Sequence, residues 1–128
     1  MKILLDTCTF LWLILESPRL PVSALRIFAD PDNEVYLSAI STWEIALKNS
    51  LGKLPLPGRA EVFVAEQRKL HGIETLPLEE EASLYLPLLP KLHNDPFDRM
   101  LVCQSIVHGL TILTPDPLIA QYPIRTTW

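Results

Sequence analysis

Short hydrophobic runs alternate along the chain with longer segments in which apolar positions recur every three or four residues. The short runs predict buried strands, and the longer spacing predicts helices. Strands are expected at 2–6, 35–38, 73–76, 111–113 and, as a last edge strand, 124–126. Helices are expected at 7–15, 23–29, from the second strand to about Ser50, and at 60–70, 79–86, 96–108 and 115–120. This alternation predicts an α/β fold with a central parallel sheet of about four to five strands, flanked by helices.

Four acidic residues interrupt these apolar segments. Asp6 ends the first predicted strand, and Asp116 follows the strand at 111–113. Glu44 and Asp98 lie near the starts of two predicted helices. An ionised carboxylate in apolar surroundings is costly unless something compensates it. Because strand carboxyl ends and the following helix starts meet at one sheet edge, where ligands bind, we expect the four acids to converge in one crevice.

The helical position of Glu44 gives the sharpest argument. Counting from Ile40 at about 100° per residue, Glu44 falls about 40° away and therefore inside an apolar stripe. The other members of this stripe are Trp43, Leu47 and Leu51. A capping box that begins at Ser41 would instead explain Glu44 locally, whereas a cap at Ser38 would place it in the second turn.

The acids of the later helices have local explanations too. Asp95 is suited to cap a helix whose first residue is Pro96, which puts Asp98 in the first turn, where the helix dipole favours acids. Arg99 could orient a carboxylate, contact a phosphate or simply be a solvated base.

Asp116 and Asp6 leave the same choice open. Thr114 could cap a helix that starts at Pro115, with Asp116 in its first turn. Asp6 could cap the helix at 7–15, although a lone acid that ends a buried strand is unusual.

Several carboxylates without a nucleophilic Ser, Cys or His are typical of Mg²⁺ or Mn²⁺ binding. Such an ion activates water and stabilises charge that develops on a phosphodiester. His71, His93 and His108 lack zinc-type spacing, so surface or packed positions are expected for them. The sequence contains no P-loop and no glycine-rich dinucleotide turn.

The totals narrow the function further. The chain has 128 residues, is 48% hydrophobic and carries a formal net charge of −4. This length suits a single domain over residues 1–128, and no apolar run approaches the about 20 residues of a membrane span. The negative charge excludes nucleic-acid binding by bulk positive charge. Without a basic leader we expect no signal peptide, and Cys8 and Cys103 are expected to be reduced, buried thiols in the cytoplasm.

Four segments together resemble the PIN-domain ribonucleases, in particular the VapC-type toxins of prokaryotic toxin–antitoxin pairs. These segments are Ile3–Thr7, Ser38–Lys48, His93–Leu101 and Leu110–Asp116. The resemblance implies the PIN-domain fold and a Mg²⁺- or Mn²⁺-dependent endoribonuclease. It implies an acidic cluster of Asp6, Glu44, Asp98 and Asp116. In that cluster Asp6 and Asp98 would bind the metal directly, and the other two directly or through water. Thr7, Ser41 and Thr114 match positions that often support such a site, and Arg99, beside Asp98, is a further candidate for supporting the site or contacting the substrate.

The resemblance also implies partners. These are a small cognate antitoxin, a second copy in a homodimer, and an RNA substrate such as tRNA, cut in exposed single-stranded loops. Leu11, Trp12 and Leu15 could form a surface for the dimer or the antitoxin, or could pack in the core.

Two other functions compete. A non-catalytic module of the same fold would bind RNA or protein without cleaving it. An aspartyl-phosphate phosphatase also begins with a strand that ends in Asp, but it needs a second Asp two residues later, where this chain has Cys8.

Overall fold

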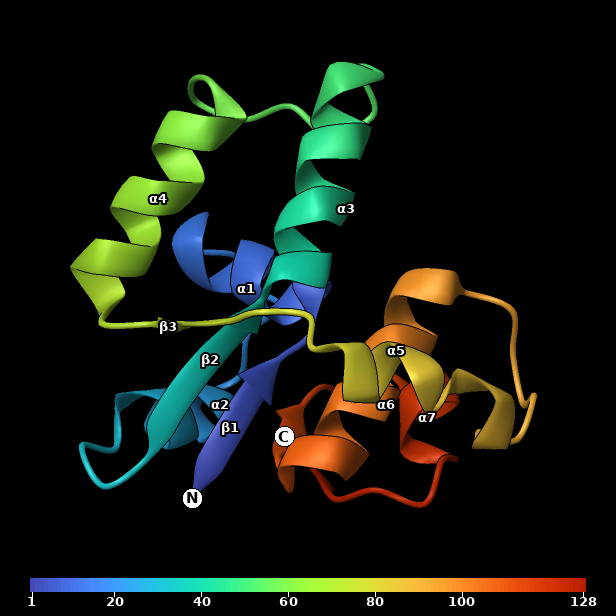
Figure 1. Cartoon of the computed structure of the whole chain (residues 1–128). Coiled ribbons are helices and arrows are strands. Elements are labelled where there is room, and N and C mark those ends of the chain that lie inside the picture. The colour runs from blue at the N-terminus through green and yellow to red at the C-terminus, as the bar shows by residue number, and fades with distance from the viewer.

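A five-stranded parallel sheet runs through the computed structural model, which describes residues 1–128 (Figure 1). The strands are β1 (Lys2–Leu5), β2 (Glu34–Ser38), β3 (Glu74–Leu76), β4 (Thr111–Leu113) and β5 (Thr126–Thr127). They lie in the order β3-β2-β1-β4-β5, and every neighbouring pair is parallel. The predicted α/β class is confirmed.

Helices connect the strands and flank the sheet (Figure 1). They are α1 (Thr7–Ile14), α2 (Val22–Ala29), α3 (Ala39–Ser50), α4 (Ala60–His71), α5 (Glu80–Leu84), the 3-10 helix η1 (Leu86–Leu88), α6 (Pro96–His108) and α7 (Pro117–Ala120). The helix predicted at 79–86 is shorter, because Pro87 has no N–H to continue α-helical hydrogen bonds and the chain tightens into η1. None of these helices has the length and apolar composition that crossing a bilayer requires.

The central strand β1 is buried on both faces. Ile3 and Leu5 belong to one core, which α1 and α2 complete, and Leu4 belongs to a second core against α6. All three side chains are fully buried. Burial on both faces explains why this strand appears in the sequence as an uninterrupted apolar run.

The chain extends the sheet from β1 in two directions. It adds β2 and β3 on one side, then returns to place β4 and β5 on the other. Leu5 of β1 lies opposite Leu113 of β4. The helices that follow these two strands pack into different cores, so the carboxyl ends of β1 and β4 form the switch point at which open α/β sheets bind ligands. Asp6 and Thr114 come directly after the two paired leucines.

A buried amide joins the elements that carry the acids. Gln104 of α6 is fully buried. Its Oε1 accepts a hydrogen bond from the Ser38 hydroxyl at 2.5 Å, and its Nε2 donates to the Pro77 carbonyl at 3.2 Å. Ser38 also accepts from the Ile40 amide and caps α3. Gln104 therefore ties α6 to the start of α3 and to the chain just beyond β3.

We expect Gln104→Leu to lower the free energy of unfolding by about 1–2 kcal/mol, because it leaves the buried Ser38 hydroxyl without its acceptor and removes the hydrogen bond to the Pro77 carbonyl. Urea denaturation followed by circular dichroism measures this change. Gln67→Leu on α4 is the matched control, because the Gln67 side chain makes no hydrogen bond in the structure, and its effect should stay within about 0.5 kcal/mol. Equal effects of the two substitutions would contradict the assigned role of Gln104.

Candidate metal centre

Asp6 is 4% exposed and uses both carboxylate oxygens. One oxygen accepts a hydrogen bond from the Thr9 amide at 2.7 Å and so caps α1. The other accepts from the Thr114 hydroxyl at 2.6 Å, across a sequence separation of 108 residues. Asp6 therefore caps its helix, as the local alternative predicted, and also joins the ends of β1 and β4.

Asp116 stands next to this contact. Its backbone amide donates to the Thr114 hydroxyl at 3.0 Å, and its carboxylate accepts from the Leu118 amide at 2.9 Å. The prediction of a helix that Thr114 caps, starting one residue after it, is wrong. Asp116 is the capping residue, and α7 begins at Pro117.

Glu44 lies in the second turn of α3 and is 6% exposed. Because Ser38 is the N-cap, the alternative capping box is wrong. The buried face of this helix consists of Ile40, Ser41, Glu44 and Ile45. The apolar stripe that predicted this burial is itself exposed, with Trp43 at 59% and Leu51 at 58%. Glu44 is buried as predicted, but on a different face of the helix from most of that stripe.

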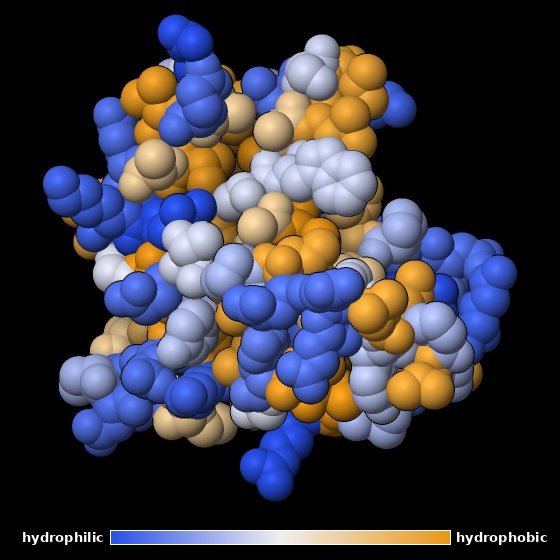
Figure 2. Space-filling model, in the orientation of Figure 1, coloured by the Kyte–Doolittle hydropathy of each residue, from blue (hydrophilic) through white to orange (hydrophobic).

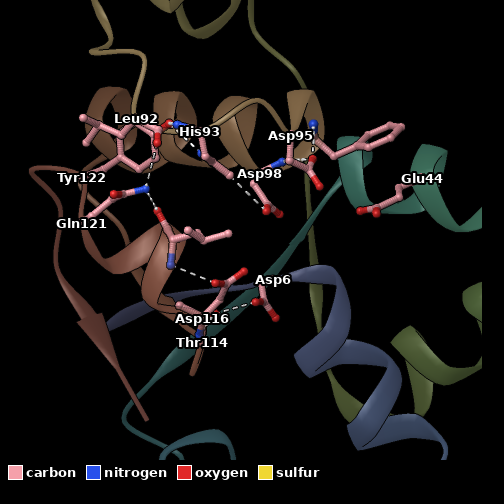
Figure 3. Close-up of polar contacts among 12 residues, drawn as sticks. Asp6, Glu44, Leu92, His93, Asp95, Asp98, Thr114, Asp116, Gln121 and Tyr122 are labelled. Carbon is pink, nitrogen blue, oxygen red and sulfur yellow. Dashed lines mark hydrogen bonds and ion pairs between the residues drawn. The ribbon is translucent and has the colours of Figure 1, made fainter.

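The two oxygens of Glu44 have different surroundings. Lys48, one turn later, forms an ion pair with Oε2, and this hydrogen bond raises the pKa of Lys48. The other oxygen, Oε1, is buried and has no hydrogen-bond partner. Figure 3 shows the Glu44 carboxylate directed from α3 towards the side on which Asp98 lies. A bound cation or its water would satisfy this oxygen, which is otherwise costly to bury.

Asp98 occupies the first turn of α6. Asp95 caps this helix, as predicted, and accepts hydrogen bonds from the amides of Phe97 and Asp98 at 2.9 and 3.0 Å. The Asp98 carboxylate is therefore free of the capping role. Its side-chain hydrogen bond is with His93, whose Nε2 lies 3.3 Å from Oδ2.

The carboxylates act on one another electrostatically. Burial raises the pKa of Asp98 to about 6, and the negative charges of Asp95, Asp116 and Asp6 act in the same direction, against the hydrogen bond from His93. Burial also raises the pKa of Asp6, although its two threonine partners oppose the change. Figure 3 shows Asp6, Asp98 and Asp116 around a common space. The switch point therefore concentrates negative charge.

The predicted supporting residues divide into two groups. The Thr7 hydroxyl donates to the buried Ser41 hydroxyl at 3.0 Å and links α1 to α3, and Thr114 holds Asp6. Arg99 instead donates to the Leu89 carbonyl at 3.5 Å and forms an ion pair with none of the acids. Thr7, Ser41 and Thr114 thus link the segments around the acids. Arg99 follows Asp98 on α6, but its side chain contacts the segment after η1.

The two cysteines differ from each other. Cys103 is buried, but Cys8 is exposed, so the expectation of a buried Cys8 is wrong. It follows Asp6 on the first turn of α1, at the same edge of the sheet. Partial desolvation raises the pKa of the Cys8 thiol, and the charges of Asp6, Glu44 and Asp98 raise it further. This environment disfavours the thiolate and makes Cys8 a poor nucleophile.

The donor set fits a hydrated hard cation. Carboxylate oxygens suit Mg²⁺ and Mn²⁺, and Mg²⁺ usually keeps several waters while it binds one or two carboxylates. No three acidic, imidazole or thiol side chains are grouped closely enough to hold an ion by themselves, so water would have to complete the coordination of an ion bound here. None of the three cavities is lined by these acids, so the predicted crevice is an open face. Oδ1 of Asp98 and Oε1 of Glu44 have no hydrogen-bond partner and remain available as ligands.

Sequence reasoning missed three residues near the acids. Lys48 had a signal, because a base four residues after Glu44 lies on the same helix face. His93 was expected to be a surface or packed residue. It lies before the cap of α6 and Asp98 lies after it, so no helix or strand periodicity in the sequence indicated that the two side chains meet. Tyr122, which hydrogen-bonds His93, gave no signal at all, because only the fold brings it there.

Comparison with known proteins agrees with this fold. The family model of the PIN domain matches residues 3–124. Ribonuclease VapC16 of Mycobacterium tuberculosis is 36% identical over 66 residues, which are 48% of this chain and 47% of that protein, so the match spans about half of this curated relative. The structure of VapBC2 from Rickettsia felis bound to a promoter DNA fragment has a TM-score of 0.75 at 16% identity, covering 99% of this chain and 98% of that one. VapBC-1 from nontypeable Haemophilus influenzae has a TM-score of 0.67 at 16% identity, covering 99% and 97%. Since the family match extends over nearly the whole chain, this protein belongs to the PIN domain family.

Proposed function

We propose that this protein is a Mg²⁺- or Mn²⁺-dependent endoribonuclease and the toxin of a toxin–antitoxin pair. The observation that carries the proposal is the group of carboxylates at the β1–β4 switch point, in which burial and neighbouring acids raise the pKa of Asp98. Similarity to a ribonuclease of the VapC type supports the activity. The proposal extends to the whole of residues 1–128 as one PIN domain.

In this proposal Asp6 and Asp98 hold the ion, and Glu44 and Asp116 bind it directly or through water. When bound, the ion supplies Lewis-acid stabilisation of the phosphodiester and lowers the pKa of water. The chain itself supplies orientation. Thr114 fixes the Asp6 carboxylate, and the Asp95 cap fixes the first turn of α6 and hence the backbone position of Asp98.

The net charge of −4 opposes the binding of RNA, which is itself negatively charged. Acids at the site repel phosphate unless a cation neutralises them, so the same ion serves binding and cleavage. Single-stranded loops of a structured RNA such as tRNA suit an open site, because their phosphates and splayed bases are accessible.

We expect the purified, antitoxin-free protein to cleave RNA in Mn²⁺ and to lose roughly a hundredfold or more of that activity in excess EDTA. Gel analysis of a labelled tRNA measures the cleavage, and restored Mn²⁺ should restore it. Equal cleavage with and without EDTA would contradict the metal dependence. RNA that binds without being cut in Mn²⁺ would identify the non-catalytic module instead.

The antitoxin and the homodimer are also part of the proposal, and exposed apolar surface supports a protein partner. Large exposed apolar side chains on α3, its C-cap and α4 include Trp43, Leu47, Leu51, Val62 and Leu70, and Figure 2 shows apolar surface over both helices. A hollow of about 500 Å³ lies between the two helices. Of the surface predicted at the first helix, Leu15 is exposed, at 43%. Leu11 and Trp12 are less available, because Leu11 packs on the core and Trp12 lies edge-on against Trp128, with ring centroids 5.9 Å apart.

A further inference from the structure

His93 lies between a metal-site carboxylate and a buried tyrosine. Its Nε2 is 3.3 Å from Asp98 Oδ2, and its Nδ1 is 2.7 Å from the Tyr122 hydroxyl (Figure 3). The His93 side chain is 9% exposed, and Tyr122 is 3% exposed. The His93 backbone amide also donates to the Tyr122 hydroxyl, at 3.3 Å. Neither residue has a role in the proposed function as stated above.

These contacts select one arrangement of protons. The Asp98 carboxylate only accepts hydrogen bonds when ionised, so His93 Nε2 must carry the hydrogen that it receives. In the neutral ring Nδ1 is then an acceptor, and the Tyr122 hydroxyl donates to it. The tyrosine oxygen keeps its own acceptor capacity for the His93 backbone amide. Every donor and acceptor in the hydrogen-bond series from Tyr122 to Asp98 is therefore paired in a compatible role.

Asp98 depends on this series of hydrogen bonds for its orientation more than Asp6 depends on any single contact. Asp6 is held on both oxygens by Thr9 and Thr114, whereas the carboxylate of Asp98 has His93 as its hydrogen-bond partner. Two residues that follow α7 hold the loop that carries His93. Tyr122 contacts His93, and Gln121 Nε2 lies 3.4 Å from the Leu92 carbonyl. The loop thus connects α7, which Asp116 caps, to α6, whose first turn contains Asp98.

We propose that His93, with its tautomer fixed by Tyr122, is a positioning residue that holds Oδ2 of Asp98 and leaves Oδ1 free to bind a metal ion. This inference rests on the proposed metal-dependent function. Groups that hydrogen-bond a metal ligand orient it, and their loss typically lowers metal affinity or activity by about 10–100-fold.

Three substitutions separate orientation from packing. His93→Asn keeps an amide near the Nδ1 position but cannot reach Asp98. His93→Gln places an amide donor near the Nε2 position and serves as the conservative rescue. Tyr122→Phe keeps the buried ring and removes only the hydroxyl. Isothermal titration calorimetry gives the Mn²⁺ dissociation constant, thermal melting of the metal-free proteins reports folding, and tRNA cleavage against Mn²⁺ concentration gives the activation midpoint.

We expect His93→Asn to raise the Mn²⁺ dissociation constant roughly 10-fold or more, Tyr122→Phe to raise it several-fold, and His93→Gln to recover most of the affinity. Melting temperatures that fall in all three variants with an unchanged dissociation constant would overturn the inference. If His93→Asn does not fold, Tyr122→Phe decides the question, and wild-type Mn²⁺ affinity in that variant counts against the role.

The proposed function fails separately. Asp98→Asn should abolish binding, and wild-type protein that neither binds Mn²⁺ nor cleaves RNA would end both proposals. Wild-type binding that Asp98→Asn removes, but that all His93 and Tyr122 variants retain, would end only this inference.

Discussion

Asp98→Asn should reduce Mn²⁺-dependent RNA cleavage by roughly a hundredfold or more while the protein stays folded. The carboxylate is only partly exposed, and burial together with neighbouring acids already raises its pKa to about 6. A neutral amide at this position removes electrostatic repulsion, so the metal-free fold should not lose stability. What disappears is the charged oxygen that binds the ion. Initial cleavage rates of a labelled tRNA, at a Mn²⁺ concentration that saturates the wild-type protein, measure the effect.

Asp95→Asn is the matched control on the same helix. Asparagine caps helices about as well as aspartate, so both backbone hydrogen bonds at the start of α6 should survive. We expect cleavage within a fewfold of wild type, because Asp95 acts as a cap and lies outside the proposed ligand set. Asp6→Asn should resemble Asp98→Asn. Wild-type activity in either of those two variants would show that the cluster has been assigned to the wrong residues.

In the absence of divalent ions, the free energy of unfolding should fall as the pH rises from about 4 to about 6. Burial raises the folded-state pKa of both Asp98 and Asp6 above the ordinary aspartate value of 3.8. Within this window the folded protein binds more protons than the unfolded chain, and stability therefore decreases as protons are removed. Above about pH 7 the Asp98 carboxyl is ionised in both the folded and the unfolded state and contributes no further slope.

Mn²⁺ should reverse this loss. The ion binds the ionised carboxylates, so at 100 times its dissociation constant it adds about 2.7 kcal/mol to stability, which corresponds to roughly 10 °C in melting temperature for a chain of this size. Protons compete with the ion near pH 5, and the shift there should be much smaller than at pH 7.5. Differential scanning fluorimetry across this range, with Asp98→Asn as control, measures both effects. An equal Mn²⁺ shift at both pH values would contradict ion binding to these carboxylates.

Local sequence signals predicted most of the secondary structure because the determining interactions are local. Asp95 and Pro96 start α6 where they were expected to, and Gly72 ends α4 in the left-handed conformation that glycine adopts without strain. The apolar run of β1 indicated burial on both faces. Boundaries failed where neighbouring residues competed for one role, as Thr114 and Asp116 did for the cap of α7.

The site was less predictable, and Glu44 shows why. Helical projection identifies which residues share a face but not which face packs inward. The buried side of α3 contains Ser41 and Glu44, whereas Trp43 and Leu51 are largely exposed. Which face of a helix is buried depends on the element that packs against it, and the sequence of the helix alone does not show this. The exposure of the Cys8 thiol was missed for the same reason.

By itself, the sequence determined the alternation of strands and helices, the cap of α6, and the four acids at or near element ends, since each depends on residues only a few positions apart. Only the tertiary structure decided that β4 lies beside β1, which brings Thr114 within hydrogen-bonding distance of Asp6. It also decided that Tyr122 reaches His93 and, through it, Asp98. Strand order and helix packing depend on the total apolar burial in two cores. Those cores are built from residues far apart in the sequence, so no short segment determines them.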